Sequence, residues 1–372
     1  MKQINENNIF IAGGGTGGHL FPAVTIGEKL KKRGMKIIYI GSKYGIENIF
    51  FKKNNIEAEL LEIKGIQRDL SFKSIITNLY FPIRFVRAYF KSRSLIRKFN
   101  PKIIIGTGGY SSGLPLLAGI HMKIPTIIQD QNSVPGLITK KLYKKVDLVC
   151  LAYKSAFKYL NSKNKIITGN PIRDSLKLID KQIAKKNLGL NLNKKTIFVL
   201  GGSQGSRIIN THILNNIDFY TKNNFQIYLQ CGSKNYDLIS KSTFKNKNII
   251  IKKFIDDMST IYSASDLVIS RAGALAISEL CFMGKAMILI PFKYAANNHQ
   301  ELNALEIRKN KACVIINEDD LKFGNLENEL KNILEKKESI KTLEKKSLEI
   351  SKINSTDIIV DNILKIKNAY NF

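Results

Sequence analysis

Five glycines and one histidine stand close together near the start of the chain, in the segment 13–19 with the sequence Gly-Gly-Gly-Thr-Gly-Gly-His. Glycines let the backbone approach an anion closely, and the N-terminus of a following helix adds unpaired N–H groups and a partial positive charge. The apolar run 9–12 predicts a buried strand before the segment, and apolar residues at helical spacing over 20–30 predict a helix after it. The segment therefore predicts a phosphate-binding turn with His19 at its mouth; a tight turn without a ligand is the alternative.

The same order of strand, glycine turn and helix returns twice, at 106–113 and at 201–206. Apolar runs that alternate with helical segments indicate parallel, doubly wound sheets. Because the plan starts again after a break at Gly169-Asn170-Pro171-Ile172-Arg173, we expect an α/β protein with two Rossmann-like domains facing across a cleft. The further predicted strands are 36–41, 59–63, 101–106, 125–128, 147–152, 165–168, 196–200, 226–231, 248–252, 266–270, 286–290 and 312–316.

The composition limits the class of protein. The 372 residues include 59 Lys and Arg against 30 Asp and Glu, a formal net charge of +29. The basic residues are spread over the whole chain, so they support nucleic-acid binding only weakly. The four isolated cysteines predict buried reduced thiols rather than a zinc site. A polar start and the lack of an apolar run of about 18 residues predict a cytoplasmic protein with neither signal peptide nor membrane span.

A basic and aromatic stretch over 71–99 carries more large apolar side chains than one buried helical stripe needs. One interpretation is a peripheral membrane contact, in which apolar side chains enter the lipid and cations meet anionic headgroups. The other is an ordinary core helix with a solvated basic face. The candidate membrane residues are Ile75, Leu79, Phe81, Phe85, Lys73, Arg84, Arg87 and Lys140.

Polar residues follow several predicted strands. Gln129-Asp130-Gln131-Asn132 ends one strand, at the edge where open α/β sheets bind ligands. Glu279 is the only acid on the expected first turn of the helix after 270–273, and helix capping is its alternative role. The second strand ends at Ser42 without the acid that an NAD site needs, although Lys43 could serve NADP.

Six segments together resemble the MurG family of peripheral membrane glycosyltransferases, which complete the lipid-linked peptidoglycan precursor. The resemblance implies a GT-B fold and an inverting transfer of N-acetylglucosamine from UDP-N-acetylglucosamine to the 4-hydroxyl of lipid I, undecaprenyl-pyrophosphoryl-N-acetylmuramoyl-pentapeptide, giving lipid II. It implies neither a metal nor a cofactor beyond the donor. The segments, in the expected order, are Gly14-Gly15-Thr16-Gly17-Gly18-His19, Gly108-Gly109-Tyr110, Asn170-Pro171-Ile172-Arg173, Gly201-Gly202-Ser203-Gln204-Gly205, Ser270-Arg271-Ala272-Gly273-Ala274 and Asn298-His299-Gln300.

The resemblance also assigns roles to residues. Glu279 would hold the ribose, Ile255 would present its backbone to uracil, and Arg173 would hold the nucleotide and phosphates. His19 is the expected general base, because a side chain that titrates near neutrality suits that work, and Asp130 is the next candidate. The acceptor pyrophosphate would meet Gly14, Gly15, Gly108, Gly109 and Tyr110. The full donor set is Thr16, Gly17, Gly18, Asn132, Arg173, Ser203, Ile255, Ala274, Leu275, Ala276, Ile277, Ser278, Glu279 and Gln300.

By the same resemblance, residues 1–169 form the acceptor and membrane-facing domain, 170–350 the donor domain, and 351–372 a helix that returns to the first domain. The expected partners are UDP-N-acetylglucosamine, lipid I and an anionic membrane surface at the cytoplasmic face of the inner membrane. Other cell-wall enzymes are further candidates, and no nucleic acid is expected. The expected processes are cell-wall biogenesis, cell shape and cell division.

One departure and several alternatives remain. The chain has Gln-Asp-Gln-Asn at 129–132, where the family usually has His-Glu-Gln-Asn. An NADP-dependent oxidoreductase and another UDP-sugar enzyme of the same fold are the open alternatives. A basic nucleic-acid-binding protein is a third, and it leaves the three glycine turns unexplained.

Overall fold

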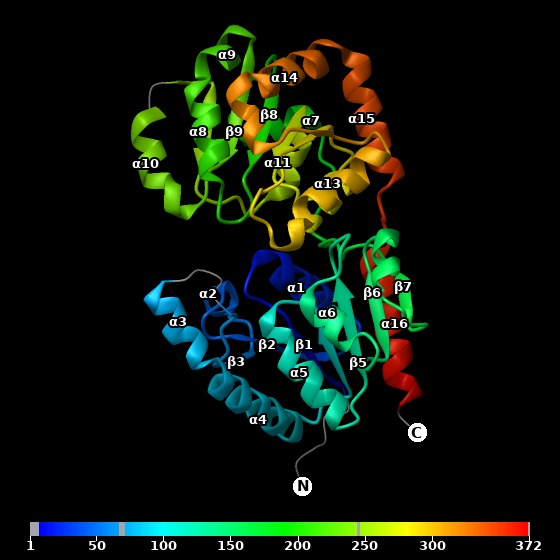
Figure 1. Cartoon of the computed structure of the whole chain (residues 1–372). Coiled ribbons are helices and arrows are strands. Elements are labelled where there is room, and N and C mark those ends of the chain that lie inside the picture. The colour runs from blue at the N-terminus through cyan, green and yellow to red at the C-terminus, as the bar shows by residue number, and fades with distance from the viewer. Residues whose placement is uncertain (1–6, 67–70, 244–245, 371–372) are drawn as a thin grey trace. The chain divides into compact units, whose positions relative to one another are not determined.

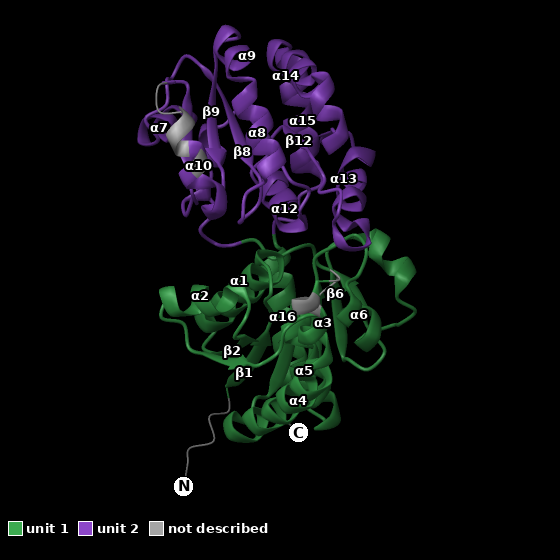
Figure 2. Ribbon diagram, turned by 60° about the vertical axis from the view of Figure 1, so that its left-hand side comes forward, with its two compact units in different colours: residues 1–172, 354–372 green, residues 173–353 purple. Residues whose placement is uncertain are grey.

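The computed structural model describes residues 7–66, 71–243 and 246–370. The chain divides into two compact units, residues 1–172 with 354–372, and residues 173–353 (Figure 2). These divisions lie three residues after the expected ones at 169 and 350. Each unit is built on one parallel sheet with helices packed on it (Figure 1).

The sheet of the first unit has the order β3-β2-β1-β4-β5-β6-β7, and every neighbouring pair is parallel. The chain winds outward in one direction from β1 to β3 and in the other from β4 to β7, so the direction changes between β1 and β4. The strands are β1 (Asn8–Ala12), β2 (Lys36–Ser42), β3 (Ala58–Leu61), β4 (Ile103–Gly106), β5 (Thr126–Asp130), β6 (Leu148–Leu151) and β7 (Lys165–Ile167).

Alternate residues of these strands face two different helical layers. Phe10, Ile38 and Ile104 pack in a core with α4 (Phe81–Phe99), α5 (Tyr110–His121) and α6 (Leu137–Leu142). Ile9, Ile37 and the other alternate strand residues pack with α1 (Gly17–Lys32), α2 (Ile46–Lys53) and α16 (Ser355–Ala369). The C-terminal helix α16 therefore completes the core of the first unit. The remaining helices are α3 (Phe72–Leu79) and the 3-10 helix η1 (Lys154–Tyr159).

The second unit repeats this plan, with the sheet order β10-β9-β8-β11-β12-β13. Its strands are β8 (Lys195–Leu200), β9 (Phe225–Gln230), β10 (Ile249–Lys252), β11 (Leu267–Ser270), β12 (Met287–Leu289) and β13 (Val314–Ile315). Its helices are α7 (Lys181–Asn187), α8 (Arg207–Asn215), α9 (Ile217–Lys222), α10 (Ser233–Thr243), α11 (Met258–Ala264), α12 (Ala274–Phe282), η2 (Ala296–Asn298), α13 (His299–Lys309), η3 (Glu318–Phe323), α14 (Asn325–Glu335) and α15 (Lys337–Glu349). The direction of winding changes between β8 and β11.

The predicted strand ranges agree with the thirteen strands of the described residues to within two residues at each end. The prediction of buried free cysteines is also confirmed for all four. The stretch 71–99, in contrast, forms two helices, α3 and α4, that break at Tyr80. Pro82 explains the break, because proline lacks an N–H and fits the first turn of a new helix.

Candidate active site

The glycine turns lie at the carboxyl ends of the central strands, at the point where each sheet reverses its winding. In the first unit they follow β1 and β4, and in the second unit one follows β8, while the segment 271–273 follows β11. This switch point is where open α/β sheets bind their ligands, because the loops diverge there and leave a crevice. The topology therefore puts the turns at this edge of each sheet, and their role in binding stays a prediction.

The first turn holds His19 between two glycine segments. His19 lies in the first turn of α1, and its Nδ1 is 3.2 Å from the hydroxyl oxygen of Thr16. The Thr107 hydroxyl donates to the His19 carbonyl at 2.7 Å. The imidazole lies against Gly108 and Gly109, where a Cβ on Gly108 would be 2.6 Å from Cδ2 of His19. Both glycines have positive φ, so this close approach suits glycine alone.

Glu47, which contacts the same turn, was not among the residues predicted from the sequence. Its side chain is fully buried, and its carboxylate accepts the N–H of Gly15 at 2.7 Å and that of Ser42 at 2.8 Å. The Gly15 N–H, assigned to the acceptor pyrophosphate by resemblance, is therefore used inside the protein. An available signal was the acid in the first turn of a helix, preceded closely by Gly41 and Gly45.

Three of the four residues in the segment 129–132 are buried and bind other groups of the protein. The expectation that they face a ligand is therefore wrong. Gln129 and Gln131 are buried: the Gln131 amide donates to the side-chain oxygen of Gln129, and the Gln129 amide donates to that of Asn170. The Asn170 amide donates to the backbone carbonyl of Gln131. Asp130 accepts from the N–H groups of Asn132 and Gly136 and from the Thr139 hydroxyl. Burial raises the pKa of Asp130, but its bonds fix the next loop, so it is badly placed to serve as a base.

The second unit carries a cation at its glycine turn. Gly202 and Gly205 have positive φ, and Ser203 between them is exposed. The hydroxyl of Ser206 accepts the Ile209 N–H and so caps α8. The buried Arg271 donates to this hydroxyl at 2.7 Å and pairs with the carboxylate of Glu318.

Arg173 and Glu279, two predicted donor residues, are in direct contact. Nε and Nη2 of Arg173 donate to one oxygen of Glu279 at 2.9 and 2.6 Å, and the Tyr262 hydroxyl donates to the other at 3.2 Å. Burial and the carboxylate raise the pKa of Tyr262 well above its usual value. Glu279 is the sixth residue of α12, whose first turn has no acid, so its predicted place on that turn and the capping alternative were wrong.

The other predicted donor residues lie around the same strand ends. The Ile255 N–H donates to the side-chain oxygen of Gln230 at 2.9 Å, and the side-chain oxygen of Gln300 accepts the N–H of Phe292 at 3.0 Å. Residues 274–278 form the start of α12 after Gly273, which has no side chain to cap the helix. Thr16, Gly17, Gly18 and Asn132, by contrast, belong to the first unit. The predicted donor set is thus divided between the two units.

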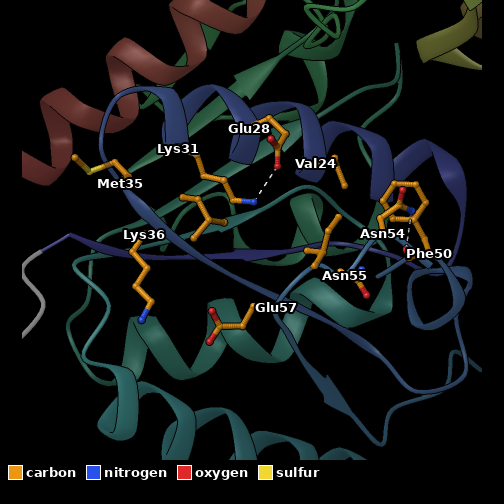
Figure 3. A pocket seen from close by; sticks show the side chains of 11 residues that line it. Val24, Glu28, Lys31, Met35, Lys36, Phe50, Asn54, Asn55 and Glu57 are labelled. Atoms are coloured by element: carbon orange, nitrogen blue, oxygen red, sulfur yellow. Dashed lines mark hydrogen bonds and ion pairs between the residues drawn. The ribbon is translucent and has the colours of Figure 1, made fainter. Parts of the chain in front are cut away.

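A cavity of about 630 Å³ in the first unit lies away from these turns (Figure 3). Its lining includes Lys36 at the start of β2 and Glu57 just before β3, so it opens at the amino ends of the strands. Figure 3 also shows the ion pair between Glu28 and Lys31 on α1. Among the residues that the structure describes, no three His, Cys, Asp or Glu side chains gather as a metal site would require.

Comparison with known proteins decides the family. The model of the glycosyltransferase family 28 N-terminal domain matches residues 9–151, and that of the C-terminal domain matches residues 196–360. The chain belongs to glycosyltransferase family 28. It is therefore a hexosyltransferase, and its two parallel-sheet, Rossmann-like units are those of the GT-B class, as predicted.

The relatives agree with the more specific prediction of the MurG family. The chain is 36% identical over 369 residues to the UDP-N-acetylglucosamine--N-acetylmuramyl-(pentapeptide) pyrophosphoryl-undecaprenol N-acetylglucosamine transferase of Finegoldia magna, covering 96% of this chain and 98% of the relative. It is also 36% identical to the Flavobacterium psychrophilum protein of the same name, covering 98% of each. The crystal structure of Acinetobacter baumannii MurG matches with a TM-score of 0.73 at 24% identity, covering 96% of this chain and 99% of that one.

Proposed function

We propose that this enzyme transfers N-acetylglucosamine from UDP-N-acetylglucosamine to the 4-hydroxyl of the muramoyl sugar of lipid I, giving lipid II and UDP. The observation that carries the proposal is 36% identity, over 98% of the relative, to a protein named for this transfer. The glycine turn at the switch point of the second sheet supports it, since the donor carries a pyrophosphate that backbone N–H groups can bind. The product places the enzyme in peptidoglycan-precursor synthesis.

The donor is assigned mainly to the second unit. Arg173 and the backbone N–H groups at the start of α12 and at Ser203 would meet the phosphates. Glu279 would accept hydrogen bonds from the ribose, because a carboxylate has about four acceptor sites and Arg173 and Tyr262 do not use them all. Uracil would meet the Ile255 carbonyl, since the Ile255 N–H already serves Gln230. Gln300 is assigned to the sugar.

In the transfer itself, the acceptor oxygen forms a bond to the anomeric carbon while the bond from that carbon to the UDP phosphate oxygen breaks. UDP leaves with the electron pair, and Arg173 with nearby N–H groups would stabilise its growing negative charge. His19 would take the proton of the attacking hydroxyl and release it to solvent. This scheme uses no cofactor.

We assign membrane contact to α3 and α4, which is the first of the two interpretations of the stretch 71–99. Leu79 and Phe90 are 72% and 62% exposed, and Arg84 and Arg87 lie between them on α4. Single exposed apolar residues are ordinary, but a row of them along two consecutive helices is typical of an interaction surface. The apolar face consists of Ile75, Ile76, Leu79, Tyr80, Ile83, Phe85, Val86 and Phe90.

Two of the predicted membrane residues do not belong to this face, and the side chain of a third is not described. Phe81 is half-buried and packs on the core. Lys140 lies on α6 and over the ring of Tyr159. The side chain of Lys73 lies outside the described residues. No helix in the described ranges has the length and apolarity to cross a bilayer, so the proposed contact is peripheral.

The membrane assignment is tested with vesicles of neutral and of anionic lipid. Wild-type protein should sediment with anionic vesicles and release as salt rises, because each nearby cation contributes about 1 kcal/mol that salt screens. Leu79→Ser with Phe90→Ser should reduce binding, whereas Leu178→Ser, at an exposed leucine of the second unit, should not. Equal binding to both vesicle types would reject the assignment.

We place the enzyme on the cytoplasmic face, where nucleotide sugars are available.

The central experiment incubates the enzyme with radiolabelled UDP-N-acetylglucosamine and a short-chain lipid I analogue. A labelled lipid-linked disaccharide with a β linkage is expected. Release of an isomerised sugar without acceptor would favour another UDP-sugar enzyme.

The oxidoreductase alternative has little support, because the exposed Lys43 pairs with Glu62 at 2.6 Å. In cells, depletion of the enzyme is expected to disturb shape and division through the loss of wall precursor.

A further inference from the structure

Glu47 is held by two separate elements of the first unit. One carboxylate oxygen accepts the N–H of Gly15 in the glycine turn at 2.7 Å, and the other accepts the N–H of Ser42 at the end of β2 at 2.8 Å. The side chain is 0% exposed. Hydrogen bonds to an ionised acceptor are about twice as strong as neutral ones, so this carboxylate links the turn firmly to β2.

Three glycines leave the space that the carboxylate occupies. A Cβ on Gly14 would be 2.3 Å from the carboxyl carbon of Glu47, one on Gly45 would be 2.1 Å from Oε2, and one on Gly41 would be 2.6 Å from Cγ. Real Cβ atoms do not approach other atoms this closely, so a side chain at any of these positions would displace Glu47. A side chain at position 14 would therefore clash with Glu47, and this clash explains the glycine without any ligand.

The glycine turn also lies against Gly109, which is next to the His19 ring. The carbonyl oxygen of Gly14 would be 2.3 Å from a Cβ on Gly109, and Nδ1 of His19 would be 3.2 Å from that same Cβ. A shift of the turn at Gly14 or Gly15 would therefore press on Gly109 and change the place of the imidazole. Glu47 is connected in this way to the side chain that we propose as the base.

We propose that Glu47 is a positioning residue for His19: it fixes the turn 13–19 against β2, so that the imidazole keeps its place beside Gly108 and Gly109. This inference rests on the proposed role of His19 as the general base. Glu47 itself touches no substrate in this scheme. Its effect should appear in the step that His19 performs and not in donor binding by the second unit.

The first test is Glu47→Gln, which keeps the shape but replaces one acceptor oxygen by an NH2 group facing an N–H. The kcat at saturating donor and acceptor should fall about 10- to 100-fold, because a displaced general base loses part of its contribution of about 10²- to 10⁴-fold. UDP affinity by calorimetry should stay unchanged. Glu327→Gln is the matched control, because Glu327 is also buried but binds His212 in the second unit. It should lower stability without lowering kcat.

Gly45→Ala provides a second variant that leaves the charge in place. Gly45 has φ of −91°, which alanine can adopt, but the added Cβ would displace Glu47. Gly136→Ala is its control, because Gly136 also begins a helix and its Cβ would meet only Asp130 at an ordinary 3.7 Å. The first variant should lower kcat and the control should not.

A double mutant separates positioning from a general loss of structure. Glu47→Gln in a His19→Ala background should change kcat less than twofold, whereas independent effects would multiply. Unchanged kcat in both Glu47→Gln and Gly45→Ala would overturn the inference, as would multiplicative effects. If His19→Ala alone keeps its kcat, the proposed base is wrong. In that case, NMR signals of the His19 ring still test whether Glu47 positions the ring. They should shift in Glu47→Gln, and unshifted signals would reject the positioning role.

Discussion

The two glycine turns after β1 and β8 look alike in sequence but differ in what lies behind them. Behind the first turn is a buried anion, Glu47, which takes the N–H of Gly15. Behind the second is a buried cation, Arg271, which binds Ser206 at the start of α8 and is paired with Glu318. The glycines of the first turn make room for a carboxylate. In the second turn, a Cβ on Gly205 would instead meet the backbone carbonyl of Cys231.

This difference shows that a glycine-rich turn does not by itself predict a phosphate. At the first turn, Glu47 already takes the N–H of Gly15, so this group cannot bind a phosphate. At the second turn, the charge of Arg271 is balanced by Glu318, and an anion would bind to backbone N–H groups there. The second turn therefore suits the UDP pyrophosphate better. The first turn suits a neutral hydroxyl facing His19. The expected effects of mutations differ between the two turns accordingly.

The largest effect is expected at the first turn. His19→Ala should lower kcat by about 10²- to 10⁴-fold, the usual contribution of a general base. UDP affinity should stay nearly unchanged, because UDP is assigned to the second unit. Steady-state kinetics at saturating acceptor and calorimetry with UDP check both parts. His121→Ala, at the end of α5, is the control and should keep its kcat. Near-normal kcat in His19→Ala would place the base elsewhere.

The second turn should respond through stability. Arg271→Met leaves the Glu318 carboxylate buried without its partner, which costs about 3–5 kcal/mol in comparable buried pairs. Urea unfolding should show this loss in the free energy of unfolding. Adding Glu318→Leu should recover much of it, because the unpaired charge is then gone. If the double variant is no more stable than Arg271→Met, the pair is not what holds this turn.

Glu279→Ala should act on donor affinity. Losing a charge-assisted hydrogen bond to the ribose costs about 1.5–3 kcal/mol, or roughly ten- to a hundredfold in affinity. Calorimetry with UDP measures the change, and thermal unfolding checks that the variant, which leaves Arg173 and Tyr262 without their shared partner, still folds. Glu335→Ala, an exposed acid on α14, is the control. Equal UDP affinity in both variants would contradict the ribose assignment.

The smallest effect concerns pH, and it should have opposite signs in the two units. Burial raises the pKa of Asp130, so the folded state binds the extra proton and Asp130 stabilises the first unit more as pH falls. Burial also opposes ionisation of Asp266, but Lys181, Lys185 and the Thr196 N–H outweigh it and lower the pKa below its ordinary 3.8. The stability that ionised Asp266 contributes is present above pH 3.8. It is lost as pH falls through the pKa of Asp266 in the folded state.

Urea unfolding of Asp130→Asn and Asp266→Asn between pH 3 and 7 tests this contrast. The stability of wild type minus that of Asp130→Asn should grow as pH falls. The same difference for Asp266→Asn should shrink. Neither slope can exceed about 1.4 kcal/mol per pH unit, the value for one proton. Slopes of the same sign for the two variants would show that the two carboxylates do not differ in the proposed way.

The sequence by itself determined the strands, the parallel sheets and the family. Apolar runs such as 9–12 and 196–200 are continuous because these strands are buried on both faces, and that signal needs no tertiary information. The glycine turns could be predicted because positive φ and close approach restrict the residue type locally. His19 and Glu279 could be singled out from their places beside a glycine turn and near a helix start, whereas Arg173 was assigned through the resemblance to a family.

Only the tertiary structure decided which polar groups already form hydrogen bonds within the protein. Gln129, Asp130 and Gln131 end a strand and so looked ligand-facing. They are instead buried, and Gln129 binds Asn170, 41 residues away in the sequence. Glu47 is 32 residues from the Gly15 N–H that it accepts. Whether a side chain binds a ligand or the protein depends on which distant groups folding brings within hydrogen-bond reach, and no local pattern in the chain records that.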